Sequence, residues 1–340
     1  MSSLLRSTRF SVLDRSRTRR GQDHPTALRD TVRFARQAEA LGYHRFWVSE
    51  HHSVPGVAGS APTVLAAAIA AATSRIRVGT GGVMLPNHRP IVVAEQFGVL
   101  EALHPGRIDM GLGRSVGFTS GIRRALGHGK EDADDFPAQL AELLGYLRGD
   151  QQVHPGVHAW PAEGLNVPPF ILATGSGADI AAEFGLPVVT AAAFGEDRML
   201  AAIERYRAAF RPSVWAAEPY VVVSGTVAVA ETREAAHRLL VSEAWSNAYS
   251  RTRGVFPPLM PAEEVLALEM TDRERTHFEQ GLRGHIHGTE EEVAEALERL
   301  VARSGADEIL VHTSTYDRDD VLDSHRRLAR LAGLAAPARI

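Results

Sequence analysis

The chain has 340 residues, a formal net charge of −4 and a sequence pI near 6.4, which argues against a basic nucleic-acid-binding surface. It contains no cysteine, so disulfides, thiolate zinc sites and a cysteine nucleophile are excluded. Lys130 is the one lysine, so a lysine aldimine or a P-loop lysine is excluded at every other position. We attribute the excess of arginine over lysine mainly to genomic base composition.

Short runs rich in β-branched residues alternate with longer helical patterns along the chain. Strands are predicted over 10–13, 45–49, 76–79, 108–112, 170–173, 187–190, 220–229 and 308–311. Helices are predicted over 26–41, 62–73, 92–103, 135–147, 178–184, 198–210, 289–302 and 319–331, with another starting near 232. Eight strands separated by helices favour a closed (β/α)8 TIM barrel, formed by a single domain over residues 1–340, rather than a Rossmann sheet.

One segment breaks this alternation. Residues 249–287 are rich in Pro, Gly, Arg and Glu, and we expect them to form an insertion or mobile loop that acts as a lid over one barrel end. Arg251 and Arg253 would then face the substrate. The start of the chain has no apolar signal segment, and the apolar run 64–72 is too short to span a bilayer, so we expect a cytoplasmic protein without membrane contact.

In a barrel the functional site lies at the carboxyl ends of the strands. The second predicted strand ends in Glu50-His51-His52. A carboxylate beside an imidazole can hold its tautomer and support general acid–base work. Adjacent side chains on a strand point to opposite faces, so we favour His51 as the functional histidine and leave His52 a structural role or a substrate contact. A metal site is disfavoured because the spacing supplies no third ligand.

The third and fourth strands are followed by glycine-rich segments. Gly81-Gly82 permits close approach of a ligand, although an ordinary turn or bulge is the alternative. Gly113-Arg114 follows the fourth strand, in a GxGxxxG spacing that fits a Rossmann fingerprint poorly. Arg114 is either a cation that grips a phosphate or a partner in an ordinary salt bridge.

The segment Thr174-Gly175-Ser176-Gly177 lies between the fifth predicted strand and a helix. Free N–H groups at the start of a helix, together with two hydroxyls, form an anion cradle. The alternative is a plain helix cap formed by Ser176. Because neighbouring barrel strands would bring this segment close to Arg114, we predict a single phosphate site.

Four motifs in this order resemble those of the bacterial luciferase-like flavin monooxygenases. They are FWVSEHHSVPG at 46–56, VGTGGVMLPNHRP at 78–90, GRIDMGLGR at 106–114, and the stretch 169–187 that ends AAEFGLP. The resemblance runs from about residue 10 to residue 334. It implies a TIM barrel and an oxidoreductase that uses reduced FMN, supplied by a separate flavin reductase, and O2 to oxygenate a small or medium-sized organic substrate. The arginine-rich composition points to a bacterium in which such enzymes often tailor natural products.

The resemblance also implies residue roles. The position matching His51 lies beside the flavin and supports the oxygen-bearing intermediate, and Glu50 and His52 support the end of the strand. The pair matching Gly81-Gly82 carries a non-prolyl cis peptide that faces the isoalloxazine ring. Arg114 would bind the flavin phosphate with help from Thr174, Gly175, Ser176 and Gly177.

Some properties of the resembling family stay open for this chain. Luciferase has a cysteine at the position matching Gly113, so that contact is absent here. Related enzymes use a deazaflavin coenzyme of the F420 type for hydride transfer, and other members are non-catalytic partner subunits. Members commonly form dimers through barrel helices, so a homodimer is expected.

Overall fold

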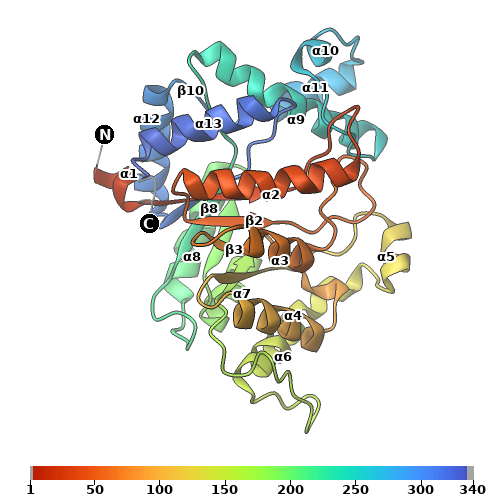
Figure 1. Ribbon diagram of the computed structural model, residues 1–340, viewed down its shortest axis with the longest axis vertical. Helices are drawn as coiled ribbons and strands as arrows, with labels where there is room; N and C mark the ends of the chain where they lie inside the picture. The colour runs from red at the N-terminus through yellow and green to blue at the C-terminus, as the bar shows by residue number, and fades with distance from the viewer. Residues whose placement is uncertain (1–2, 335–340) are drawn as a thin grey trace.

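The computed structural model describes residues 3–334 and consists of a closed parallel barrel with helices around it (Figure 1). The predicted (β/α)8 architecture is therefore correct. Going round the barrel, the eight strands are β1 (Arg9–Asp14), β2 (Arg45–Val48), β3 (Arg77–Thr80), β5 (Ile108–Gly113), β6 (Pro169–Leu172), β7 (Val188–Ala191), β8 (Val221–Gly225) and β11 (Glu308–Val311). Pairing of β11 with β1 closes the ring.

Helices follow the strands and cover the outside of the barrel. The longer ones are α2 (His24–Ala40), α3 (Pro62–Ala72), α4 (Pro90–Leu103), α6 (Phe136–Arg148), α7 (Gly177–Phe184), α8 (Glu196–Ala209), α9 (Arg233–Arg253), α12 (Glu290–Ser304) and α13 (Arg318–Leu331). The short elements α1 (Ser3–Ser7), β4 (Val83–Met84), η1 (Leu85–Asn87), α5 (Ser120–Leu126) and η2 (Glu131–Asp135) were not predicted. Thr289 and Glu292 form a capping box at the start of α12.

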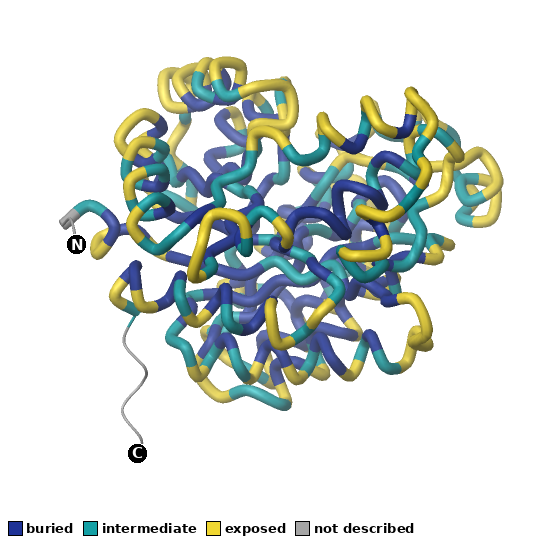
Figure 2. The backbone as a smooth tube through the Cα atoms, turned by 90° about the horizontal axis from the view of Figure 1, so that it is seen from above, coloured by how far each residue is buried: buried dark blue, intermediate teal, exposed yellow. Residues whose placement is uncertain are grey.

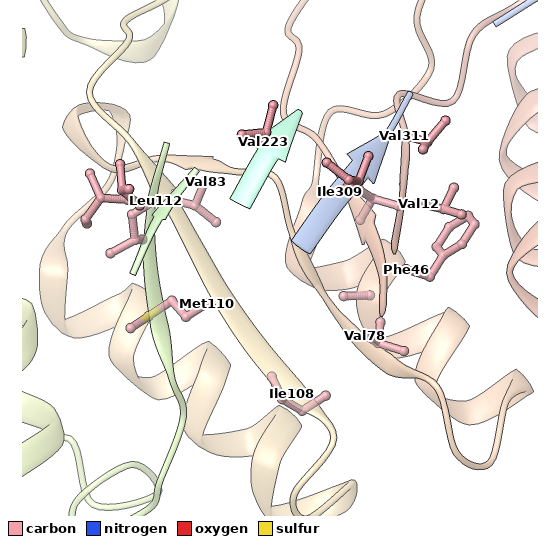
Figure 3. Close-up of a cluster of buried hydrophobic side chains, with 14 of the residues drawn as sticks. Val12, Phe46, Val78, Val83, Ile108, Met110, Leu112, Val223, Ile309 and Val311 are labelled. Carbon is pink, nitrogen blue, oxygen red and sulfur yellow. The ribbon is translucent and has the colours of Figure 1, made fainter. Parts of the chain in front are cut away.

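Alternation along the strands builds two apolar layers. One residue set points outward against the helices, as Val12, Phe46, Val78, Ile108 and Ile309 do in Figure 3. The next residues along the strands point inward and fill the barrel with Trp47, Phe170, Val189, Val222 and Leu310. Figure 2 shows the result, with buried residues through the centre of the molecule and exposed ones on the outer turns of the helices.

A buried ionic network occupies the amino end of the barrel. Arg45 lies between Asp109 and Glu308, at 2.7 and 3.0 Å, and the Trp47 indole N–H donates to Asp109 at 3.1 Å. Arg77 forms a further ion pair with Asp109 at 2.6 Å. With large side chains filling the middle of the barrel and this network at its base, a ligand site is left to the carboxyl end.

The predicted strand 220–229 is two strands. After β8 the chain leaves the barrel, and β9 (Val227–Val229) pairs with β10 (Ile286–Gly288) in a separate two-stranded sheet. The Val227 N–H donates to the side chain of Thr313 at 3.1 Å. Ser224-Gly225-Thr226 interrupts the apolar residues where the chain changes sheet, so the sequence contained a signal for this break that the prediction did not use.

The segment 249–287 contains helices and is not one continuous loop. It contains the end of α9 together with α10 (Ala262–Leu266) and α11 (Asp272–Gly281), which Figure 1 shows gathered at the top of the molecule. These helices have a small core of their own, formed with α9 by Trp245, Val265 and Phe278. Movement of this segment as a lid stays a prediction.

Across residues 3–334, none of the helices combines the length and apolar character that crossing a bilayer requires.

Candidate active site

A cavity of about 510 Å³ opens at the carboxyl ends of β2, β3, β5 and β6. Ten residues predicted from the sequence line it together: Glu50, His51, Gly81, Gly82, Gly113, Arg114, Thr174, Gly175, Ser176 and Gly177. Ser49, Met84, Ser115, Phe118, Leu172 and Ala173 complete the lining. The structure thus assembles in one place the motifs that the sequence scatters over about 130 positions.

His51 is a neutral imidazole at the edge of the cavity. Burial, together with the positive charges of Arg15 and Arg17, lowers its pKa to about 4. Its Nδ1 lies 3.1 Å from the hydroxyl of Ser49, and its ring stacks on Phe118 with centroids 5.9 Å apart. Among the described residues, Nε2 has no hydrogen-bond partner, so this atom is free for a ligand.

Glu50 does not contact His51, contrary to the pairing that the sequence favours. Its buried carboxylate accepts from His52 Nε2 at 2.8 Å, from His88 Nε2 at 2.9 Å and from the Met84 N–H at 3.0 Å. Burial alone would raise the pKa of Glu50, but the hydrogen bonds from the two histidines outweigh it and lower the pKa to about 2. Glu50 therefore joins the end of β2 to the β4–η1 segment.

The Gly81–Gly82 peptide bond is cis, as the resemblance implied. A Cβ atom on Gly81 would lie 2.7 Å from Leu13 Cδ1, and one on Gly82 would lie 2.8 Å from the Gly111 carbonyl oxygen. Only glycine lets the backbone pack this tightly against the barrel. The cavity wall here is a bare peptide surface, against which a flat ring can lie.

The other end of the cavity is suited to an anion. Arg114 is exposed, and within residues 3–334 no carboxylate pairs with it, so the salt bridge left open as an alternative is absent. Gly177 lines the cavity and starts helix α7, so the positive end of the helix dipole lies at this end of the cavity. The Ala178 and Asp179 N–H groups already donate to the Gly175 and Ser176 carbonyls, both at 3.1 Å. Ser176 occupies the N-cap position but its side chain caps nothing, which leaves the hydroxyl available.

Three predicted substrate contacts lie outside the cavity lining. His52 is held by Glu50, Arg251 is exposed near the end of α9, and Arg253 forms an ion pair with Glu274 at 2.8 Å. The segment instead approaches the site through Phe256, whose ring lies 6.3 Å from that of Phe118.

Sequence reasoning missed four residues around the site: Ser49, His88, Phe118 and Phe256. Two of them had a local signal, because Ser49 directly precedes Glu50 and His88 lies within the motif 78–90. The two aromatic residues come from segments far apart in the chain and meet only in the folded barrel.

Comparison with known proteins places this chain in a family. The family model described as luciferase-like monooxygenase matches residues 8–308. The chain belongs to the luciferase-like monooxygenase family.

Relatives cover nearly the whole chain. A luciferase-like monooxygenase of Escherichia coli (strain K12) is 35% identical over 317 residues, 93% of this chain and 94% of the relative. An N-acetyl-S-alkylcysteine monooxygenase of Bacillus subtilis (strain 168) is 34% identical over 315 residues, 90% and 92% of the two chains. The crystal structure of apo-MsnO8 is 31% identical with a TM-score of 0.85, and the match covers 97% of this chain and 99% of that one.

Two more distant structures share the fold, each with a TM-score of 0.71. One, 17% identical, is the oxygenating constituent of 3,6-diketocamphane monooxygenase in complex with FMN, and it matches 95% of this chain and 97% of its own. The other, 16% identical, is an F420-dependent secondary alcohol dehydrogenase, with 96% and 99% covered. The family fold thus accommodates both FMN and F420.

We expect Glu50→Gln to lower the free energy of unfolding at pH 7 by about 2–3 kcal/mol, because a buried acceptor of three hydrogen bonds loses its charge. The pKa of Glu50 is depressed in the folded state, so its contribution is complete above the unfolded value of 4.5 and is lost as the pH falls toward 2. Urea unfolding of both proteins at pH 7 and at pH 4 or below measures the difference.

Glu269→Gln is the matched control, because Glu269 is exposed and forms no ion pair within the described part of the chain. Equal stability of Glu50→Gln and Glu269→Gln at pH 7 would contradict the role given to Glu50.

Proposed function

We propose that this protein is a flavin-dependent monooxygenase that binds reduced FMN and uses O2 to oxygenate a small or medium-sized organic substrate. One observation carries the proposal: a single cavity has an unpaired arginine and a helix N-terminus at one end, and a bare cis peptide with a neutral histidine at the other. This polarity matches a molecule with a phosphate at one end and a flat ring at the other.

Reduced FMN, when bound, supplies the two electrons with which O2 gives one oxygen atom to the substrate and the other to water. The residues of the chain bind and orient the cofactor. Arg114 and the start of α7 hold the phosphate, and Gly81-Gly82 supports the ring. Neutral His51 can donate or accept a hydrogen bond at Nε2 toward the reacting oxygen.

The same proposal includes the size of the substrate and the source of the reduced flavin. The relative named N-acetyl-S-alkylcysteine monooxygenase supports a substrate of modest size. A separate flavin reductase would deliver the reduced cofactor in the cytoplasm through a transient encounter.

A deazaflavin-dependent hydride transfer is the second candidate, and one feature favours it. A neighbouring cavity of about 320 Å³ shares Thr174 and Gly175 with the first and is bordered by Arg198 and Arg205. A cofactor with a longer anionic tail than FMN would extend into it. A non-catalytic partner subunit is disfavoured, because His51 and Arg114 both line the cavity.

We expect product formation to require both reduced FMN and O2, and His51→Ala to lower kcat by about 100-fold, the usual scale for a lost proton-transfer or hydrogen-bonding group. Turnover of a substrate panel with and without oxygen, followed by mass spectrometry with labelled O2, measures both effects. His154→Ala, a change at an exposed histidine, serves as control.

Turnover that persists without oxygen and needs F420 would replace the proposal with hydride transfer. Unchanged turnover in His51→Ala would remove His51 from the chemistry.

We expect Arg114→Ala to weaken FMN binding by roughly 1.5–3 kcal/mol, the scale of a hydrogen bond to a charged group. Isothermal titration of the variant and the wild type with FMN measures this, and Arg124→Ala on exposed α5 is the matched control. Riboflavin, which lacks the phosphate, should bind both proteins equally. A loss of riboflavin affinity in Arg114→Ala would show a general disturbance of the site instead.

We also propose that the protein is a homodimer that pairs through α3 and α4. Both helices are apolar nearly all round, a pattern typical of helices covered on every side. Their outer faces nevertheless expose Val64, Val99 and Leu103, at 69%, 48% and 69% of the residue surface. A second copy of the chain would cover this surface.

We expect the double variant Val99→Glu and Leu103→Glu to be monomeric, because burying two carboxylates in an apolar interface is unfavourable. Light scattering after size-exclusion chromatography measures the mass. Val214→Glu alters an exposed valine elsewhere and should leave the dimer intact. A wild-type protein that is monomeric at micromolar concentration would contradict the proposal.

A further inference from the structure

A second group of charged side chains lies at the barrel mouth, beside His51. Arg15 and Arg17 follow β1, and His312 and Ser314 follow β11. Around the barrel, β1 lies opposite β6 and β11 lies opposite β5. The two arginines are therefore across the mouth from the phosphate-binding end of the cavity, with the end of β2 and His51 next to them.

The two arginines have spare hydrogen-bond donors. Arg15 forms an ion pair with Glu243 of α9 and donates to the His312 carbonyl at 3.1 Å and to Ser314 Oγ at 3.3 Å, all through Nη2. Arg17 is 95% buried, and within the described part of the chain its side chain donates one hydrogen bond, from Nη2 to Ser246 Oγ at 2.5 Å. The Nε atoms of both arginines are buried without a partner.

The Nη1 atoms differ from the Nε atoms. Within residues 3–334 neither Nη1 donates a hydrogen bond, and neither is among the buried atoms without a partner. The side chain of Arg15 is 21% exposed, and Arg17 borders a small cavity of about 20 Å³. A guanidinium presents its donors as a planar fork that fits a carboxylate. The fork of Arg17 is mostly unused.

The charges here do not balance. Glu243 is the one carboxylate whose field raises the pKa of Arg17, and Glu243 is already paired with Arg15. Burial outweighs it and lowers the pKa of Arg17 to about 10. A buried cation without its own anion destabilises the folded protein. An anionic ligand bound to Arg17 would remove that cost. An arginine that only connected structural elements would not need such a ligand.

We propose that Arg15 and Arg17 form a binding site for an anionic group, a carboxylate in the first instance, on the organic substrate. That the anion belongs to the substrate rests on the proposed function, whereas the anion site itself does not. The flavin phosphate has its own cation, Arg114, on the far side of the mouth. The substrate body then lies over His51, near the aromatic rings of Phe118 and Phe256.

The site also affects His51. The positive field of Arg15 and Arg17 disfavours protonated His51. A carboxylate bound to the arginines would offset this field and raise the pKa of the imidazole. Substrate binding would thereby change the protonation behaviour of the group closest to the reacting atoms.

The test measures binding of small carboxylates to the whole chain without FMN. Benzoate and phenylacetate are compared with benzamide and phenylacetamide, which match them in shape, by calorimetry and by melting temperature at constant ionic strength. We expect each acid to bind at least about tenfold more tightly than its amide, the scale of a charge-assisted hydrogen bond. Arg17→Gln should reduce this preference to less than about twofold, and Arg17→Lys should restore part of it.

Two further variants sharpen the test. The double change Arg15→Gln with Glu243→Gln removes the second cation without leaving its carboxylate unpaired, and it should also reduce the preference for the acid. Arg20→Gln is the matched control, because Arg20 is exposed, pairs with Glu264 and lies outside the site. FMN affinity should be unchanged in Arg17→Gln, in contrast to Arg114→Ala.

The absence of any preference for acids in the wild type, including a lack of binding by all four probes, would overturn the proposal. A preference that survives in Arg17→Gln would also overturn it. Loss of FMN affinity in Arg17→Gln would assign the cation to the cofactor instead. The binding test uses neither FMN nor O2. A preference for acids would therefore remain valid even if the protein had no monooxygenase activity.

Discussion

Closure of the parallel sheet is the constraint on which everything else in this molecule depends. Hydrogen bonding of β11 to β1, and of β3 to β5, forces the carboxyl ends of all eight barrel strands to one mouth. Large inward side chains such as Trp47 and Phe170 fill the middle, and the Arg45 ion pairs fill the base. Short polar segments that lie far apart in the sequence thus become neighbours.

Within that mouth, Glu50 hydrogen-bonds to His52 and, among the described residues, not to His51. Its carboxylate is fully occupied by His52, His88 and the backbone of the next segment, so it serves as a junction rather than as a partner of His51. His51 is thereby left with a serine hydroxyl on one nitrogen and nothing on the other. Burial and the positive charges of Arg15 and Arg17 keep the imidazole neutral, so a ligand that binds near these charges would change its pKa.

The sequence predicted the barrel and most of the cavity lining because both depend on local patterns. The periods of strands and helices can be recognised along the chain. A residue that ends a barrel strand must lie at the carboxyl end of the barrel. Ser224-Gly225-Thr226 marks the split of 220–229, but the partner strand of each half was not readable, because valines dominate both β8 and β9. Phe118 and Phe256 were missed for the same reason: their contact is made by tertiary packing alone.

We attributed the excess of arginine to base composition, but three of the arginines lie at the barrel mouth, where we propose that they bind anions. Arg114 stands without a carboxylate at one side of the mouth, and Arg15 and Arg17 share a single carboxylate at the other. Two positive sites on opposite sides of the barrel mouth would fix how a pair of anionic ligands is oriented. A phosphate-bearing cofactor entering from β5 and β6 would meet an acidic substrate held from β1 and β11, with His51 beside the arginines. A substrate without a negative charge would leave the Arg17 cation buried and unpaired, and would gain less binding energy from the same contacts. Selection for acids would then come from the charge that the protein leaves uncompensated as much as from the shape of the cavity.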